Sequence, residues 1–283
     1  MFLIANSSTT KTIWCLFDDS DKQYYTTKDI NPSLLNEEEI INILQKNLPI
    51  PKDSVSKVYF YGQGCTPENT QVVQTALSLH FEVEEVEVYS YLLGAARSLC
   101  GNEEGIVCIL GTGSNSCYYD GENIKKYVPS LGFILGDEGS GADLGKKFLV
   151  GILKKQFSRP IINEFNVNFS IPIQEVMDNV YRKPFPERYL AQFAPYITGC
   201  IYFAEIKELV EDSFSEFIRN NVNQYDKIRE VPLHFTGSIA WHFQTNLEIA
   251  LKKFRLQLGN LAKDPVEGLL NYHGSKNKNV CKL

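Results

Sequence analysis

The sequence predicts an α/β protein of two domains, and three observations support this prediction. Apolar strand-like runs alternate with helical patterns in both halves of the chain, which is typical of an α/β architecture. The length of 283 residues exceeds the size at which a single hydrophobic core keeps growing. Hydrophobic residues make up 43% of the chain and charged residues 22%, an ordinary globular composition that excludes a disordered protein.

The chain opens on a predicted β-hairpin. Residues 1–5 and 13–17 are apolar and strand-like. The polar, Ser/Thr-rich segment 6–10 between them has the composition of a turn. Residues 18–21, Asp-Asp-Ser-Asp, end the second strand.

Three helices of the first half are predicted from the residues that precede them. Ser, Thr and Asn side chains can accept hydrogen bonds from the first backbone N–H groups of a helix, and Pro is favoured at the first helical position. The predicted helices are residues 36–48 after Asn36 and before Pro49, a helix opened by Thr66 and Pro67, and residues 91–99 between Ser90 and Gly101.

Four strands follow the opening hairpin in the first half. Each is a short apolar run bounded by turn-forming residues. The predicted strands are residues 58–61, 83–88, 106–110 and 115–119, with a glycine turn at 111–114 and a further turn at Asp120-Gly121.

The second half is richer in helix. Small residues line one side of the helix that begins at Ser140. Later in the chain, an apolar strand is followed directly by Thr236-Gly237-Ser238. The predicted elements are helices 140–153, 202–220, 240–254 and 264–272, the strand 231–235, and a polar, frayed end at 274–283.

Charge and cysteine usage narrow the class of protein. A net charge of -6 without any Lys/Arg-rich run argues against nucleic acid binding. No segment reaches the length of a signal peptide or a membrane helix, so we expect a soluble cytoplasmic protein that binds no membrane. The seven Cys are scattered without a CxxC pair, and the four His are isolated. We therefore expect free thiols and no metal held by His or Cys.

Three short turns could hold an anion. They are residues 6–12, Gly111-Thr112-Gly113-Ser114-Asn115 and Thr236-Gly237-Ser238. None is a Walker P-loop or a Rossmann fingerprint. A glycine turn between strands can nevertheless present several backbone N–H groups to one phosphate, and Ser and Thr hydroxyls add donors.

The middle of the chain carries the most specific motif. Residues 109–116 read ILGTGSNS, and residues 131–141 read LGFILGDEGSG. This pair closely resembles the BadF/BadG/BcrA/BcrD ATPase family and its N-acetylglucosamine kinase branch, and the resemblance extends from residue 2 to about residue 273. It implies two actin-like (ribonuclease H-like) ATPase domains with a cleft between them. It further implies a first domain of residues 1–108, with the helix 264–283 packed back on it, and a second domain of residues 109–263.

The resemblance also implies the ligands and the residues that bind them. The expected ligands are ATP, Mg²⁺ and a small-molecule amino sugar such as N-acetylglucosamine, and related kinases form homodimers. The residues expected at the nucleotide are Ser8, Thr9, Thr10, Lys11, Gly111, Thr112, Gly113, Gly237 and Ser238. Those expected at the sugar are Ser114, Asn115, Gly132 and Asp137.

Two positions depart from the family pattern, and both replace acids. Asn6 stands where the family has an Asp that helps to hold Mg²⁺, and an amide offers less to a divalent cation. Tyr91 stands where the family has the Asp that takes the proton from the sugar hydroxyl. A phenol with a usual pKa near 10 cannot readily act as that base at neutral pH.

The departures leave alternatives open. Another acid could substitute, and Glu87, Asp137 and Glu138 are candidates by their position in the sequence. A second alternative is a catalytically impaired protein that acts as a sugar or nucleotide sensor or as a regulatory subunit. A third is an activator ATPase that shares an iron–sulfur cluster between subunits, which the scattered cysteines disfavour.

Overall fold

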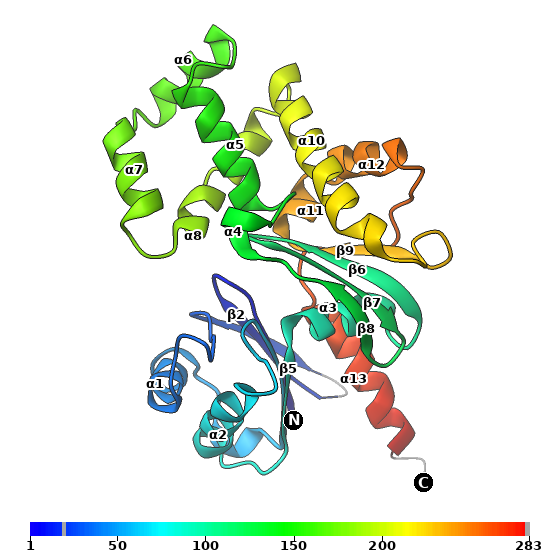
Figure 1. The fold of residues 1–283 in the computed structure, drawn as a ribbon. Coiled ribbons are helices and arrows are strands. Elements are labelled where there is room, and N and C mark those ends of the chain that lie inside the picture. Colours follow the sequence, from blue (N-terminus) through cyan, green and yellow to red (C-terminus); the bar gives the residue numbers. More distant parts are fainter. Residues whose placement is uncertain (19–20, 281–283) are drawn as a thin grey trace. The chain divides into compact units, whose positions relative to one another are not determined.

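The computed structural model describes residues 1–18 and 21–280, so part of the predicted turn at 18–21 and the last residues of the chain lie outside the described residues. The chain forms two compact units (Figure 1). Unit 1 comprises residues 1–103, 120–124 and 264–283, and unit 2 comprises residues 104–119 and 125–263. Each unit is built on a five-stranded sheet with helices, which confirms the predicted α/β class.

The sheet of unit 1 has the strand order β3-β2-β1-β4-β5. β1 pairs with β2 and β2 with β3 in antiparallel register, whereas β1 pairs with β4 and β4 with β5 in parallel register. The sheet is therefore mixed. Its strands are β1 (Phe2–Ser7), β2 (Thr12–Phe17), β3 (Lys22–Thr27), β4 (Lys57–Gly62) and β5 (Val86–Ser90).

Alternate residues of β1 face two separate cores. Leu3 and Ala5 belong to a cluster that includes buried residues of α1 (Glu37–Asn47) and α2 (Thr70–Phe81). Ile4 belongs to a second cluster with residues of α13 (Val266–Val280). Both faces are buried because side chains of a strand alternate with a period of two, which explains why β1 reads as a continuous apolar run.

Three of the residues predicted to end helices act at α1 and α3 of unit 1. Asn36 and Glu39 form a reciprocal capping box at the start of α1. The Ser90 hydroxyl accepts a hydrogen bond from the Leu93 N–H at 3.2 Å at the start of α3 (Tyr91–Cys100). Gly101 ends α3 with a positive φ of 62°. These predictions are confirmed. A 3₁₀ turn, η1 (Lys52–Ser54), precedes β4.

The sheet of unit 2 has the strand order β10-β9-β6-β7-β8. β6 pairs with β9 and β9 with β10 in parallel register. The turn at residues 111–113 joins β6 to its neighbour β7. The strands are β6 (Glu104–Leu110), β7 (Ser114–Asp120), β8 (Ile124–Val128), β9 (Leu233–Thr236) and β10 (Leu261–Ala262).

Helices supply most of the core of unit 2. Buried side chains of α5 and α10 pack with β6 and β9, and Phe148, Phe165 and Phe193 lie among them. The helices are α4 (Gly132–Leu135), α5 (Gly141–Leu153), α6 (Arg159–Asn168), α7 (Ile173–Tyr181), α8 (Pro186–Ala191), α9 (Ala194–Gly199), α10 (Ala204–Asn220), the 3₁₀ turn η2 (Val222–Gln224), α11 (Ser238–His242) and α12 (Gln244–Lys253).

Several element predictions were wrong or incomplete. The helix opened by Thr66 and Pro67 begins only at Thr70, and residues 66–69 form a turn. The predicted helix 240–254 is divided in two at Phe243, which is buried. The predicted frayed end is helical as far as Val280.

Other elements were not predicted at all. Those in unit 2 include four short helices whose buried apolar residues join the core that α5 and α10 form with the sheet. The unpredicted elements are β3, β8, β10, α4 and α6 to α9. Within the described residues, no helix is both long and apolar enough to cross a bilayer.

Candidate functional site

The first predicted turn lies at the end of the β1–β2 hairpin in unit 1. The Ser8 N–H donates to the Lys11 carbonyl at 3.0 Å, and the Ser8 hydroxyl donates to the same oxygen at 3.1 Å. These two bonds close the turn and place Thr9 and Thr10 at its tip. Thr10 is exposed and Thr9 is half-buried, so the tip presents hydroxyl groups rather than apolar side chains.

The two departures from the family pattern both lie in unit 1. Asn6 stands near the end of β1, and Tyr91 is the first residue of α3. Burial is the main cause that raises the pKa of the Tyr91 phenol to about 12, and the polar side chain of Asn6 opposes this shift. Tyr91 is therefore protonated at neutral pH. Asn6 is only 3% exposed, and its Oδ1 has no hydrogen-bond partner among the described residues.

The second predicted turn, in unit 2, is fixed to the start of α5. The Gly111 N–H donates to the Gly113 carbonyl at 2.9 Å. The N–H groups of Gly141 and Ala142 donate to the carbonyls of Gly111 and Thr112, at 2.8 and 3.0 Å. The first N–H groups of α5 are thus occupied by the turn, and they are not left over for an anion.

Asp137 lies against this second turn. Its Oδ1 accepts a hydrogen bond from the Ser114 N–H at 3.0 Å, and a Cβ on Gly113 would lie 3.0 Å from its Oδ2. Asp137 is 8% exposed and has a positive φ of 58°, a strained conformation for a residue other than glycine. Burial is the main cause that raises the pKa of the carboxyl to about 6, and the charges of Glu138 and Asp143 add to it.

Two more of the predicted sugar residues are near in sequence to these. The Asn115 side chain accepts a hydrogen bond from the Ser116 N–H at 2.8 Å and is half-buried. Gly132 begins α4 with a φ of 74°, and a Cβ there would meet no atom within 4 Å. Gly132 therefore borders open space.

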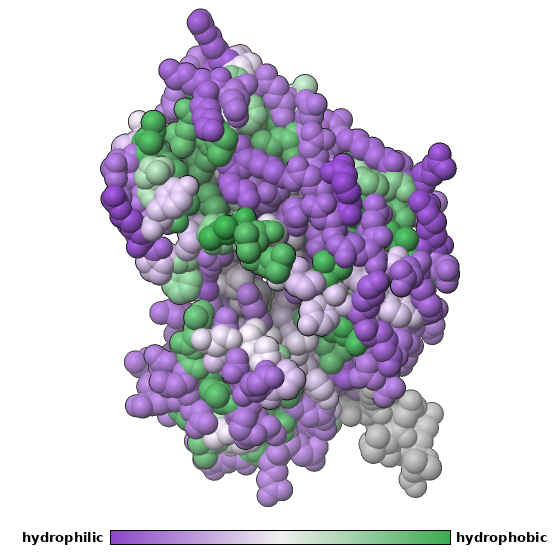
Figure 2. All heavy atoms as spheres, in the orientation of Figure 1, coloured by the Kyte–Doolittle hydropathy of each residue, from purple (hydrophilic) through white to green (hydrophobic). Residues whose placement is uncertain are grey.

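The α4 segment of unit 2 exposes a small apolar patch. Leu131, Ile134 and Leu135 are 63%, 76% and 74% exposed. Figure 2 shows apolar side chains gathered on the surface where Figure 1 places α4. The segment continues directly into Asp137, so apolar surface and a buried carboxylate adjoin in this part of the chain.

The third predicted turn joins β9 to α11 and lies against the second. Gly237 has a φ of 112°, and a Cβ there would lie 2.3 Å from the Leu110 carbonyl oxygen at the end of β6. The Gly237 N–H donates to the Ala262 carbonyl at 3.1 Å. Ser238 is exposed at the start of α11. Unit 2 therefore brings residues 110–114, Asp137 and Gly237 together.

The acids considered as substitutes are engaged elsewhere. Glu87 forms an ion pair with Lys57 at 2.7 Å and accepts a hydrogen bond from the Tyr89 hydroxyl at 2.5 Å. Glu138 accepts hydrogen bonds from Asn220 at 2.8 Å and from Asn221 at 3.3 Å. The negative charge of Asp264, a residue that the sequence did not single out, adds to the raised pKa of the Tyr91 phenol, of which burial is the main cause.

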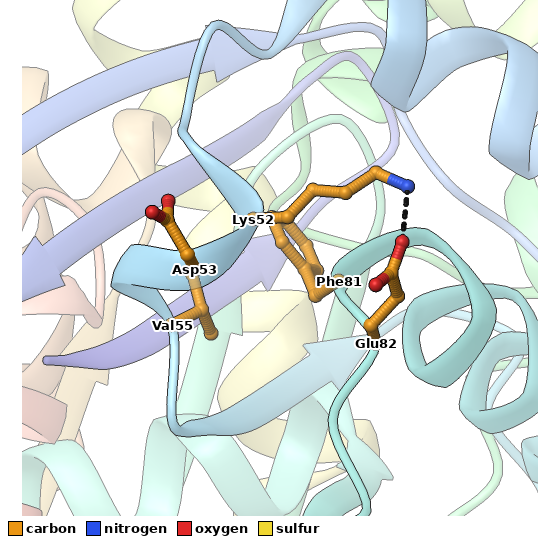
Figure 3. A pocket seen from close by; sticks show the side chains of 5 residues that line it. All are labelled: Lys52, Asp53, Val55, Phe81 and Glu82. Atoms are coloured by element: carbon orange, nitrogen blue, oxygen red, sulfur yellow. Dashed lines mark hydrogen bonds and ion pairs between the residues drawn. The ribbon is translucent and has the colours of Figure 1, made fainter.

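A separate surface pocket of unit 1 contains none of the predicted residues. It has a volume of about 500 Å³ and is lined by Lys52, Asp53, Val55, Phe81 and Glu82 (Figure 3). Lys52 and Glu82 form an exposed ion pair at 2.9 Å. Within residues 1–18 and 21–280, no three His, Cys, Asp or Glu side chains are grouped as a metal site.

The fold and these turns define a class of protein: an actin-like ATPase fold of the sugar-kinase type, with a mixed five-stranded sheet in each unit. One solved structure, named a putative N-acetylglucosamine kinase, from Porphyromonas gingivalis, is 41% identical, with a TM-score of 0.94 over 98% of this chain and 100% of that one. The chain therefore belongs to the N-acetylglucosamine kinase-like family of actin-like ATPases.

More distant structures share the fold. A second putative N-acetylglucosamine kinase, from Chromobacterium violaceum, is 16% identical, with a TM-score of 0.72 over 96% of this chain and 99% of that one. A ROK family glucokinase from Streptomyces griseus, in complex with glucose and AMPPNP, is 9% identical, with a TM-score of 0.54 over 96% and 97% of the two chains. No protein-family model and no curated protein matches the chain.

Proposed function

We propose that this protein transfers a phosphoryl group from ATP to N-acetylglucosamine or a similar amino sugar. The observation that carries the proposal is the likeness, over 98% of this chain and 100% of the other, to the Porphyromonas gingivalis protein named a putative N-acetylglucosamine kinase. The turns described above supply chemistry that fits. They combine hydroxyl groups and a buried carboxylate, which can bind phosphates and sugars through hydrogen bonds.

The residues of both units fit a nucleotide. In unit 1, Ser8, Thr9, Thr10 and Lys11 would bind its phosphates, and in unit 2, Gly111, Thr112 and Gly113 would do so. The nearest atom to a Cβ on Gly111 would be 4.0 Å away, so glycine leaves the outer side of the second turn clear. Gly237 and Ser238 would border the adenosine. Bound Mg²⁺-ATP would supply the phosphoryl group and the positive charge that stabilises its transfer.

Asp137 is the residue best suited to hold the sugar. With a pKa raised to about 6, its carboxyl is mostly ionised at neutral pH and can accept hydrogen bonds from sugar hydroxyls. The Ser114 N–H occupies one oxygen and so fixes the orientation of the group. Asn115 and Gly132 would complete the sugar pocket, because an amide can bond an acetamido group and Gly132 borders open space.

Asn6 can assist a bound cation without carrying charge. Its Oδ1 is buried and has no partner within the described residues, so it can accept a hydrogen bond from a metal-bound water. Tyr91, with its pKa raised to about 12, cannot take the proton from the sugar hydroxyl at neutral pH. The non-catalytic alternative, a sugar or nucleotide sensor, rests on these two substitutions.

A coupled assay of ADP release tests the proposal. We expect Mg²⁺-dependent turnover with N-acetylglucosamine or another N-acetylated hexosamine, and strongly reduced sugar affinity in Asp137→Asn. The matched control is Asp53→Asn, which makes the same chemical change at an exposed position of unit 1. Binding of ATP and sugar by calorimetry without any turnover would favour the sensor instead, and no binding of either would refute both.

A further inference from the structure

A buried carboxylate of unit 2, Asp143, lies behind the chain segment that carries Asp137. Asp143 is in the first turn of α5, which packs beside α10 (Figure 1), and it is 3% exposed. The ligand contacts proposed above do not use this carboxylate. Every residue that it contacts in the following paragraphs belongs to unit 2.

Asp143 holds the chain just after Asp137. Its Oδ2 accepts hydrogen bonds from the Gly139 N–H at 3.3 Å and from the Ser213 hydroxyl at 2.7 Å. The Gly139 N–H also donates to the Ser213 hydroxyl at 3.1 Å, so each of the three groups bonds the other two. Ser213 comes from α10 and is completely buried. A turn connects these groups to Asp137, because the Ser140 N–H donates to the Asp137 carbonyl at 3.1 Å.

The same carboxylate reaches the chain before Asp137 through a lysine. Lys146 Nζ lies 3.6 Å from Asp143 Oδ1. It also donates a hydrogen bond to the Phe133 carbonyl of α4 at 3.3 Å. Asp143 is thus linked to the backbone on both sides of Asp137, at Phe133 and at Gly139.

A second lysine fixes Asp143 in the core. Lys147 Nζ lies 2.7 Å from Asp143 Oδ2 and 2.5 Å from Glu216 Oε2, which comes from α10. Burial alone would lower the pKa of Lys147, but the charge of Asp143 and the hydrogen bonds to both carboxylates raise it, so the ammonium stays protonated. A buried carboxylate needs such partners. Asp143 is therefore attached to both α5 and α10.

The segment that Asp143 holds has a strained backbone. Leu131 and Asp137 have φ values of 56° and 58°, which residues other than glycine rarely adopt. Gly139 has a φ of 73°, and a Cβ there would lie 3.0 Å from the Phe217 Cβ of α10. Such conformations persist only where surrounding contacts hold them. The contacts of Asp143 on both sides of Asp137 are of this kind.

We propose that Asp143 is a positioning residue for the sugar site: by holding the chain on both sides of Asp137, it fixes the Asp137 carboxyl in the orientation that binds sugar hydroxyls. This inference rests on the proposed function, in which Asp137 holds the sugar. Asp143 acts through Asp137 and does not itself contact the sugar.

Asp143 also affects the charge state of Asp137. Burial is the main cause that raises the pKa of Asp137 to about 6, and the hydrogen bond from the Ser114 N–H opposes the rise. The charges of Glu138 and Asp143 raise the pKa further, and that of Lys146 lowers it. Because the ionised carboxyl accepts hydrogen bonds from hydroxyls, sugar affinity should increase as the pH rises through about 6. Removal of the Asp143 charge should move the midpoint of this increase to lower pH.

Calorimetric titration with N-acetylglucosamine, from about pH 5 to about pH 8, tests the inference on the parent and Asp143→Asn. At about pH 8, where Asp137 is ionised in both proteins, we expect the variant to bind about 10-fold more weakly or worse. Its midpoint should also lie at lower pH, which a loss of folded protein would not cause. Ser213→Ala removes one bond of Gly139 but no charge, so it should bind about threefold more weakly with the parental midpoint.

Glu216→Gln is the matched control. It changes the ion pair with Lys147 and keeps the bond from Gly139 to Asp143, so we expect parental affinity and midpoint. A loss in Glu216→Gln as large as that in Asp143→Asn would assign the effect to the ion pair and overturn the inference.

The outcomes separate this inference from the proposed function. A parent that binds no N-acetylated hexosamine overturns both. A parent that binds the sugar, with a folded Asp143→Asn variant of equal affinity and equal midpoint, overturns only the role of Asp143. Melting temperatures show which variants fold. Where Asp143→Asn does not fold, parental affinity in Ser213→Ala overturns the role of Asp143 in the same way.

Discussion

At the scale of single residues, burial sets the chemistry of the candidate site. Asp137 is held in a left-handed conformation with its carboxyl out of water, and its pKa rises from a usual value of 3.8 to about 6. The strain and the burial both oppose folding. They persist because the hydrogen bond from Ser114 and the packing of the second turn hold the carboxyl in place, as expected of a residue kept for binding.

The raised pKa of Asp137 predicts a dependence of stability on pH. The folded state binds the proton more tightly than the unfolded chain, so the stability that this group contributes is complete below about pH 3.8 and is lost as the pH rises through about 6. Asp137→Asn removes this titration. Relative to the parent, its free energy of unfolding should therefore increase by about 2 kcal/mol between pH 4.5 and pH 7.

Urea unfolding of both proteins at the two pH values measures this difference. Asp53→Asn, at an exposed position, should show no such change. An Asp137→Asn variant whose stability relative to the parent is the same at pH 4.5 and pH 7 would mean that the carboxyl is not desolvated in the folded protein.

At the scale of elements, the ends of helices were easier to predict than their continuity. Asn36, Ser90 and Gly101 act where the sequence placed them, because caps are local hydrogen bonds that depend on a few neighbouring residues. The division of the helix 240–254 at Phe243 was not predictable in this way. Phe243, at the break, is buried in the core of unit 2. That core is formed by residues distant in the sequence, so a local pattern does not reveal the break.

The capping box at α1 gives a prediction at this scale. Asn36→Ala removes the acceptor for the Glu39 N–H, which the Asn36 side chain bonds at 3.0 Å. We expect the free energy of unfolding to fall by about 1 kcal/mol in a denaturant titration. Asn47→Ala makes the same change at the exposed last residue of α1 and should cost less. Equal effects of the two substitutions would show that helix propensity rather than capping is responsible.

At the scale of the whole molecule, the chain returns to its first unit at the end. α13 contributes Val266, Leu269 and Leu270 to one face of the sheet of unit 1, where they pack with Ile4, Cys15 and other residues of that cluster. Tyr61 donates or accepts a hydrogen bond with His273 at 2.8 Å, and Tyr59 stacks on the same imidazole. One of the two cores of unit 1 is therefore incomplete without residues beyond 263.

Truncation tests this dependence. A chain that ends at Lys263 loses three large apolar side chains from the core, at about 1.5–3 kcal/mol each, a sum comparable to the stability of a whole domain. We expect residues 1–103 of this chain to exchange their amide hydrogens rapidly. A chain that ends at Gly274 keeps these contacts and should retain slow exchange, and slow exchange in both would contradict the assignment of this core.

The sequence by itself determined the α/β class, the strands β1, β6 and β9, the helix ends at Asn36, Ser90 and Gly101, and the three turns. These features follow from alternation, apolar runs and local hydrogen bonds, which a short stretch of residues specifies. The sequence analysis missed β3, because much of this strand is exposed and its residues Lys22–Thr27 do not form an apolar run. It also missed the short helices α6 to α9.

Only the tertiary structure decided which side chains meet. The hydrogen bond of Asp137 with Ser114, the hydrogen bond of Tyr61 with His273, and the approach of Gly237 to the Leu110 carbonyl join residues far apart in the chain. Their distances depend on how strands pair and how α3 packs on α13 at Gly268. Local sequence patterns carry no information on such distances, because packing between distant elements sets them.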